Sequence, residues 1–250
     1  MHPDDPDLVA APGVLLRFRR ALNLSMFTVI VLGIVFFLQG QVADLQPYMI
    51  HPQDWSSWPA ILTAPLLHGS LEHLASNAFS VMVLGTLAGT VFPRATLRSL
   101  PVIWIGAGLG TLLIGTGGYH LGISGVTHGL GFMIFTLALF RRDRAAIAAA
   151  LIAFFFFGGM LLTVLPHEWG VSWEYHLSGA FMGVLSGILW HRADPVPPRR
   201  RYSWEDEPEE PLEWEEIEPS RPDDVPILWH RPPAPKGGAV LPFRRRLRDD

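Results

Sequence analysis

Four polar residues stand where apolar segments begin, and together they could perform acyl transfer. His73 and Asn77 lie in "HGSLEHLASN", Ser124 lies in "GISG", and His176 lies in "EYHLSGAFMG". A serine hydroxyl is a weak nucleophile until a neighbouring base takes its proton, and a neutral histidine suits that task. The developing oxyanion needs hydrogen-bond donors, which the Asn77 amide, the His73 ring and the backbone N–H of Ser124 can supply.

The same residues define what kind of serine chemistry to expect. No aspartate lies within the apolar segments to orient the histidine, and Glu174 is expected to point away from His176. We therefore predict a Ser–His dyad in place of a triad. Gly122 and Gly125 flank Ser124 and permit tight backbone geometry around it. Taken singly, each polar residue could instead make an interhelical hydrogen bond, but four at one depth favour a site.

Six apolar stretches must position these residues. Each approaches the roughly 20 residues that cross a hydrocarbon core of about 30 Å as a helix. The stretches cover residues 21–39, 74–92, 99–116, 124–140, 146–165 and 173–191. The chain is 49% hydrophobic and only 17% charged, unlike a soluble domain. Because lipid cannot satisfy exposed backbone groups, we expect an all-α membrane protein, a bundle of six transmembrane helices.

The arginines predict the direction of the six helices. They precede the first stretch, join the second to the third and the fourth to the fifth, and follow the sixth, whereas the other connections contain no Lys or Arg. The positive-inside tendency therefore places both termini in the cytoplasm. The second, fourth and sixth stretches then enter from outside. The polar residues in their first turns therefore lie at one depth near the outer face of the membrane. We expect them to line a cavity that opens outward.

The chain divides into three regions. Residues 1–20 form a short cytoplasmic N-terminus without the basic start of a cleavable signal peptide, and residues 21–192 form the six-span domain. Residues 193–250 carry the acidic, proline-bearing run "EDEPEEPLEWEEIEP" and are expected to be a disordered cytoplasmic tail. The absence of cysteine excludes disulfides and thiolate metal sites. Arginine is used almost to the exclusion of lysine, which favours a GC-rich bacterium and its inner or plasma membrane.

Glycines spaced by four residues predict close packing of the fourth and sixth helices. They are Gly125 and Gly129 in the fourth stretch and Gly179, Gly183 and Gly187 in the sixth. Such small residues let two helix backbones approach each other. This packing would bring the Ser124 hydroxyl within reach of His176.

The run "HGSLEHLASN", then "GISG", then "HLSGAFMG" resembles the signature of rhomboid intramembrane serine proteases across the six-span core. The resemblance implies Ser124 as nucleophile, His176 as general base, His73 and Asn77 in the oxyanion hole, and Gly122 in the loop before the serine. It implies cleavage of transmembrane segments of other membrane proteins, near the outer face of the lipid bilayer. It implies no metal, nucleotide or other cofactor and no nucleic-acid partner, and it leaves the oligomeric state open.

The resemblance also assigns roles to two outer segments. Residues 40–73 would lie partly in the membrane, and their Trp55 and Trp58 favour interfacial anchoring. The fifth stretch, with "FFFFGGM" and the loop after it, would gate the access of the substrate.

Three positions depart from the family pattern. His128 stands four residues after the serine, where an aromatic residue often packs on the catalytic histidine. It is expected to stack on or hydrogen-bond to His176, and a merely space-filling imidazole is the alternative. Trp58 precedes Pro59 where arginine is frequent. Tyr175 stands before the histidine where small residues are frequent.

Three other interpretations stay open. A metal site would draw on histidine and glutamate side chains, namely His68, Glu72, His73, His120, His128 and His167. Their order does not match the His-Glu-x-x-His motif of zinc proteases. A transporter or channel that uses the intramembrane histidines as proton relays is disfavoured, because the sequence shows no inverted repeat and no paired acidic residues in the spans. A catalytically inactive rhomboid-like protein that binds transmembrane helices is the remaining alternative.

Overall fold

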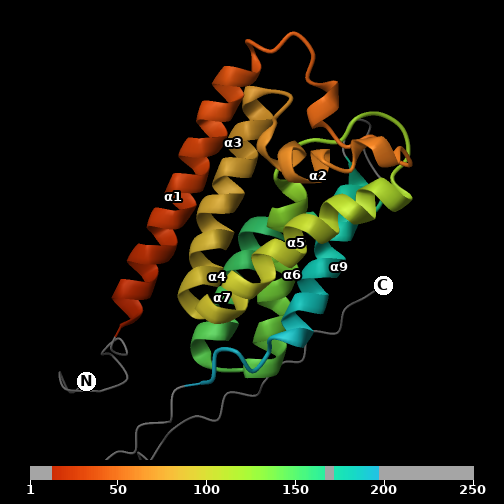
Figure 1. Cartoon of the computed structure of the whole chain (residues 1–250). Helices are drawn as coiled ribbons and strands as arrows, with labels where there is room; N and C mark the ends of the chain where they lie inside the picture. Colours follow the sequence, from red (N-terminus) through yellow and green to blue (C-terminus); the bar gives the residue numbers. More distant parts are fainter. Residues whose placement is uncertain (1–12, 167–171, 197–250) are drawn as a thin grey trace, which may run out of the picture. The chain divides into compact units, whose positions relative to one another are not determined.

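The computed structural model describes residues 13–166 and 172–196, all within one compact unit of the chain (Figure 1). The expected disordered tail falls almost wholly outside these residues, as does His167.

The described residues are helical, with one isolated antiparallel bridge between Ile50 and His120 and no strand. The helices of the bundle are α1 (Val14–Gln39), the continuous run of α3 (Leu71–Ser80), the π-helical turn η4 (Val81–Gly85) and α4 (Thr86–Val91), then α5 (Pro93–Ile114), α6 (Ser124–Arg141), α7 (Arg144–Phe157) and α9 (Trp173–Leu189), with the short α8 (Met160–Thr163) before α9. Between α1 and α3 lie η1 (Gln46–Tyr48), η2 (Trp55–Ser57), α2 (Ala60–Thr63) and η3 (Ala64–Leu66).

Within residues 13–166 and 172–196, three helical segments are long and apolar enough to cross a membrane. They are α1, the continuous run from α3 through η4 to α4, and α5, while α7 is a shorter apolar helix. The remaining two long helices are α6 and α9, of 18 and 17 residues. Their first turns carry the serine and histidine of the candidate site, which lower their hydropathy.

The centre of the bundle is α6, which contacts α3, η4, α5, α7 and α9 (Figure 1). Its buried face joins a hydrophobic core around Leu84, Ile103, Met133 and Ile134. On the outside, α1 packs along α3, η4 and α4 and exposes large apolar side chains such as Phe27, Ile30 and Phe37. Exposed apolar rows on an outer helix are what a lipid environment stabilises.

The predicted close packing of the fourth and sixth helices is confirmed. A Cβ atom added to Gly179 would overlap the backbone of Gly125, and one added to Gly183 would overlap the backbone of Gly129. Helices α6 and α9 therefore touch backbone to backbone, at a distance that no other residue type allows.

The prediction of one helix over 146–165 was wrong. Helix α7 ends at Phe157, and a separate short helix, α8, begins at Met160. Two consecutive glycines, Gly158 and Gly159, lie at the break, where their low helix propensity favours an interruption. The break turns the second half of the predicted stretch toward α6 and α9, as its contacts described below show.

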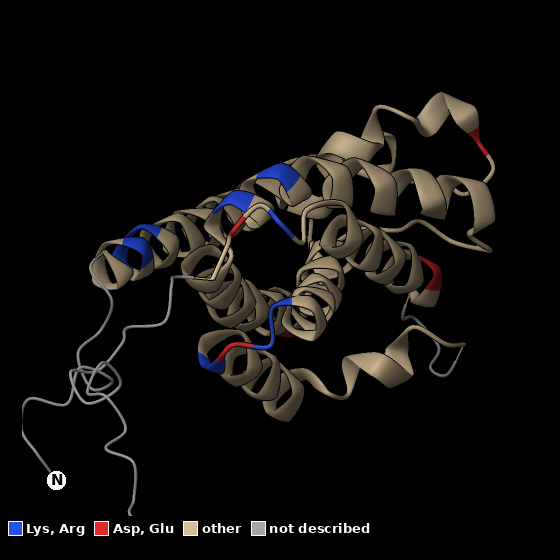
Figure 2. Ribbon diagram, turned by 90° about the horizontal axis from the view of Figure 1, so that it is seen from below, with Lys and Arg blue, Asp and Glu red and all other residues tan. Residues whose placement is uncertain are grey.

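The arginines that predicted the direction of the helices gather at one end of the bundle. Seen from the end where α1 begins, basic segments lie at the beginnings of α1 and α5 and between α6 and α7 (Figure 2). At this end the Asp194 carboxylate caps α5, accepting hydrogen bonds from the backbone N–H groups of Arg94 at 3.1 Å and Ala95 at 2.8 Å. The candidate site lies toward the opposite ends of these helices.

Candidate active site

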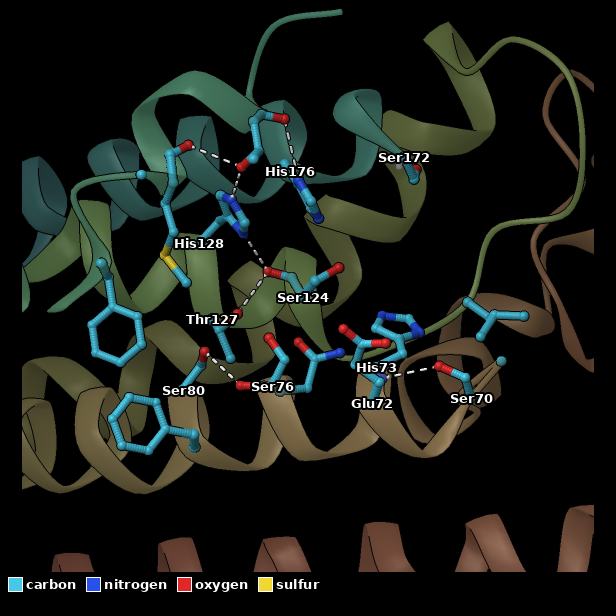
Figure 3. Close-up of a pocket in the computed structure, with 18 of the residues that line it drawn as sticks. Ser70, Glu72, His73, Ser76, Ser80, Ser124, Thr127, His128, Ser172 and His176 are labelled. Atoms are coloured by element: carbon cyan, nitrogen blue, oxygen red, sulfur yellow. Dashed lines mark hydrogen bonds between the residues drawn. The ribbon is translucent and has the colours of Figure 1, made fainter. Parts of the chain in front are cut away.

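A cavity of about 890 Å³ lies among α3, the beginning of α6, the α7–α8 segment and the beginning of α9. Five side chains named from the sequence line it: His73, Asn77, Ser124, His128 and His176. In Figure 3, Ser124 stands between the pair His128 and His176 and, on its other side, His73 of α3. The structure thus brings together residues that are up to 103 positions apart in the chain.

Ser124 is the first residue of α6. The N–H groups of a helix's first turn have no partner within the helix, and the helix dipole adds positive potential there. Gly122, two residues earlier, has a φ of 105°, which a side chain rarely tolerates. A Cβ on Gly122 would also lie 2.6 Å from Cε1 of His73. Glycine at this position therefore lets the loop turn into α6 while the His73 ring packs against its backbone.

His73 and Asn77 come from the first two turns of α3. The Ser70 hydroxyl caps this helix by accepting a hydrogen bond from the His73 N–H at 3.0 Å, which fixes where the helix begins. Asn77 is 4% exposed, and its amide nitrogen Nδ2 has no hydrogen-bond partner among the described residues. A buried unpaired donor costs about 1–3 kcal/mol. Such a donor beside a serine is what an oxyanion would use.

The His176 ring is held by the backbone of α8. Its Nδ1 lies 3.2 Å from the carbonyl oxygen of Thr163. A carbonyl can only accept, so the Nδ1 atom carries the hydrogen and the Nε2 atom of the neutral ring has a free lone pair. That is the tautomer of a general base. No hydrogen bond joins the Ser124 hydroxyl to His176 among the described residues, and both side chains face the same cavity.

The expectation that His128 stacks on His176 is confirmed. The two ring centroids are 3.9 Å apart and the planes differ by 11°. The His128 Nδ1–H donates to the Ser124 carbonyl at 2.7 Å, and Nε2 lies 2.9 Å from the Thr163 hydroxyl. His128 therefore makes two polar contacts in addition to the stacking.

Two residues beside His176 serve other contacts. The Glu174 carboxylate accepts hydrogen bonds from the backbone N–H of Thr116 at 3.0 Å and from its hydroxyl at 2.6 Å, so it points away from His176 as expected. The Tyr175 ring is buried against α6, where a Cβ on Gly125 would meet it at 2.8 Å. Gly125 therefore makes room for the bulky residue that departs from the family pattern.

Two further histidines lie at the edge of the site. The His68 ring is buried, and its centroid lies 5.1 Å from that of the His73 ring. Burial, with a smaller electrostatic effect of His73, lowers the pKa of His68 to about 4. Burial also lowers the pKa of His120, which pairs with the Ser172 hydroxyl. Both rings are therefore neutral near pH 7. Among the residues the structure describes, no three His, Asp or Glu side chains form a group that could hold a metal ion.

Thr163 contacts both histidines of this site, and the sequence did not suggest it. It lies 13 residues before His176, inside what reads as an uninterrupted apolar stretch. A single threonine there is not part of any repeating polar pattern that would indicate a site. Its carbonyl reaches His176 only because the helix is interrupted between α7 and α8.

The apolar helices and the serine- and histidine-lined cavity describe a helical membrane protein with a polar site inside it. Residues 54–193 match the family model of the rhomboid domain, which is more than half of the chain. The chain therefore belongs to the rhomboid family.

Several proteins are similar to this chain. An uncharacterized protein of Mycobacterium tuberculosis (strain ATCC 25618 / H37Rv) is 40% identical over 138 residues, which are 52% of this chain and 58% of the relative. One of Mycobacterium leprae (strain TN) is 34% identical over 135 residues, 50% of this chain and 53% of the relative. A protein of Acanthamoeba polyphaga mimivirus, named as a rhomboid protein, is 26% identical over 137 residues, 52% of this chain and 71% of the relative. The chain thus spans less than two thirds of the length of the mycobacterial relatives it matches.

Proposed function

We propose that this chain is an intramembrane serine endopeptidase that hydrolyses peptide bonds in or next to transmembrane segments of other membrane proteins. One observation carries the proposal. A single cavity is lined by Ser124 at a helix N-terminus, by Asn77 with its unpaired amide nitrogen, and by His176 in the tautomer that leaves Nε2 free. Membership of the rhomboid family supports the same activity.

The reaction would use these groups in sequence. The Ser124 hydroxyl attacks the peptide carbonyl carbon while Nε2 of His176 takes its proton. The tetrahedral oxyanion accepts hydrogen bonds from the Asn77 amide, the His73 ring and the backbone N–H of Ser124. His176 then gives the proton to the leaving amine, and water, deprotonated by the same ring, releases the acyl group from the serine.

Cleavage within a bilayer also requires a particular arrangement of helices. We infer six spans: α1, the run from α3 to α4, α5, α6, α7 and α9. The 14 residues of α7 rise about 21 Å as a helix, which is short of a full hydrocarbon core, so α7 needs the residues after it to complete the fifth span. The arginine-rich end faces the cytoplasm with both termini, and the cavity opens on the opposite side of a bacterial plasma membrane.

A fluorophosphonate probe applied to membranes tests the proposal. We expect covalent labelling of the parent chain, mapped to Ser124 by mass spectrometry, and no labelling of Ser124→Ala. The variant His176→Ala should label far more slowly, because the hydroxyl then has no base. Ser124→Ala should keep the parent's melting temperature, because it removes only a hydroxyl that faces the cavity. His176→Ala loses the ring that stacks on His128 of α6, so it should melt somewhat lower and remain folded. Equal cleavage of a transmembrane substrate by Ser124→Ala and the parent would overturn the proposal.

The second candidate is an inactive rhomboid-like protein that binds transmembrane helices. The observation in its favour is that the Ser124 hydroxyl makes no hydrogen bond to His176. Catalytic hydrogen bonds are often longer before substrate binds, so this geometry fits an enzyme without substrate as well. A parent chain that captures transmembrane peptides but is never labelled by the probe would favour this candidate.

A further inference from the structure

Thr163 touches both histidines of the site through two different groups. Its carbonyl oxygen lies 3.2 Å from Nδ1 of His176, and its hydroxyl lies 2.9 Å from Nε2 of His128. The two rings stack on each other, and His128 also binds the carbonyl of the nucleophilic serine. We propose that Thr163 is a positioning residue, which orients the base through its carbonyl and the stacked histidine through its hydroxyl. This inference rests on the proposed protease function.

The carbonyl contact takes the place of an acid. A histidine base needs an acceptor on Nδ1, so that the hydrogen stays there and Nε2 faces the nucleophile. The acidic residue closest to it in sequence, Glu174, is occupied by Thr116. The Thr163 carbonyl is the hydrogen-bond partner that the structure gives to the His176 ring.

The hydroxyl contact follows from the protons available. The Ser124 carbonyl accepts from His128 Nδ1–H, so Nε2 of a neutral His128 ring is an acceptor. The Thr163 hydroxyl has a single hydrogen, which can go either to the Met160 carbonyl at 3.1 Å or to this nitrogen at 2.9 Å, and our proposal assigns it to the nitrogen. A chain of contacts thereby runs from the Ser124 carbonyl through His128 to Thr163 and on to His176.

Helix α8 has few other contacts with the bundle, so the contacts of Thr163 largely determine how α8 is held against α6 and α9. None of its four residues is buried. Met160 packs near Gly131 of α6, where a Cβ would meet its sulfur at 3.8 Å, and Thr163 supplies the polar contacts to α6 and α9. A movement of the α7–α8 segment would therefore remove the acceptor from His176 and the donor from His128 together. His176 is therefore oriented as a base only while α8 packs against α6 and α9.

Two matched substitutions test the role of the hydroxyl. Thr163→Val keeps the shape of the side chain and loses the hydroxyl, whereas Thr163→Ser keeps the hydroxyl. We expect Thr163→Val to lower kcat and the rate of fluorophosphonate labelling of Ser124 about tenfold, the effect of one hydrogen bond on a barrier, with KM unchanged. Thr163→Ser should retain the parent's rates. Thr90→Val, which removes a hydroxyl bonded within α4 to the Thr86 carbonyl, is the control and should match the parent.

A double substitution tests whether the hydroxyl acts through His128. His128→Phe keeps a ring to stack on His176 but removes both hydrogen bonds. In that background Thr163→Val should cause no further loss, because contacting residues are non-additive when they act as one unit. Independent, multiplicative losses would overturn the inference. Thr163→Ala, tolerable on a helix with no buried residue, replaces the valine variant if that variant does not fold.

The outcomes separate this inference from the function on which it rests. A parent chain that neither labels nor cleaves overturns the protease itself. An active parent whose Thr163→Val and Thr163→Ala variants match it in kcat and labelling rate leaves the protease standing and overturns the positioning role of the Thr163 hydroxyl.

Discussion

At the scale of single residues, the site is built around hydrogen-bonding capacity that the resting protein does not use. Asn77 keeps a buried amide nitrogen that has no partner in the described part of the chain, at a cost of about 1–3 kcal/mol to folding. Because Gly122 has no side chain, the His73 ring can pack against the loop before Ser124. Both features make sense if a charge develops between Ser124 and α3 during a reaction, because preorganised donors then need no rearrangement.

Replacing Asn77 separates catalysis from stability. Asn77→Ala removes one oxyanion donor, so we expect kcat to fall about 10²–10³-fold while some activity remains. The melting temperature should stay the same or rise, because the lost group was unpaired. Ser80→Ala is the control on the same helix, since the Ser80 hydroxyl bonds the Ser76 carbonyl, and it should keep full activity. A fully active Asn77→Ala would exclude Asn77 from the oxyanion hole.

At the scale of elements, the seam between α6 and α9 determines whether serine and histidine share a cavity. Ser124 begins α6, and His176 lies in the first turn of α9. Directly below them, Gly179 and Gly183 face the backbone of α6 without any side chain between. Any atom inserted there must push the two helices apart, and Ser124 and His176 with them.

Adding one carbon to the seam tests this. Gly183→Ala places a Cβ on the Gly129 backbone, so we expect it to destabilise the protein by about 1–3 kcal/mol through overpacking and to lower activity as the helices separate. The readouts are the melting temperature and the labelling rate of Ser124. Gly33→Ala is the control, because its Cβ would meet nothing within 4 Å; it should gain about 1 kcal/mol of helix propensity. Equal melting temperatures for the two variants would contradict the seam.

The sequence predicts this seam and not the helix that completes the site, for a physical reason. Glycines four residues apart lie on one face of a helix, so the repeat beside Ser124 and His176 can be recognised in the sequence as a close-packing surface. The only sequence signal for the break after Phe157 is the pair of glycines that follows it. The surrounding apolar residues are equally compatible with one continuous helix. The contact of Thr163 depends on that break and is made partly by a backbone atom, which no residue type encodes.

At the scale of the whole domain, charge separates the two ends of the helices. Basic segments lie at the end where α1 and α5 begin, and the candidate site lies toward the other end (Figure 2). The segment between α1 and α3 exposes Trp55 and Trp58. Arginines on one side and tryptophans near the opposite interface are the usual marks of a fixed orientation in a bilayer. The site would then face away from the cytoplasm.

Single cysteines can measure this orientation directly, because the chain contains none. Trp55→Cys and Arg192→Cys each introduce one exposed thiol, in the segment after α1 and in the segment after α9. In sealed right-side-out vesicles a membrane-impermeant maleimide should label Trp55→Cys at once and Arg192→Cys only after detergent is added. Both variants should keep the fluorophosphonate labelling of Ser124, which shows that the domain is intact. The reverse pattern would place the cavity on the cytoplasmic side, and the same access of both thiols would mean that the two segments do not lie on opposite sides of the membrane.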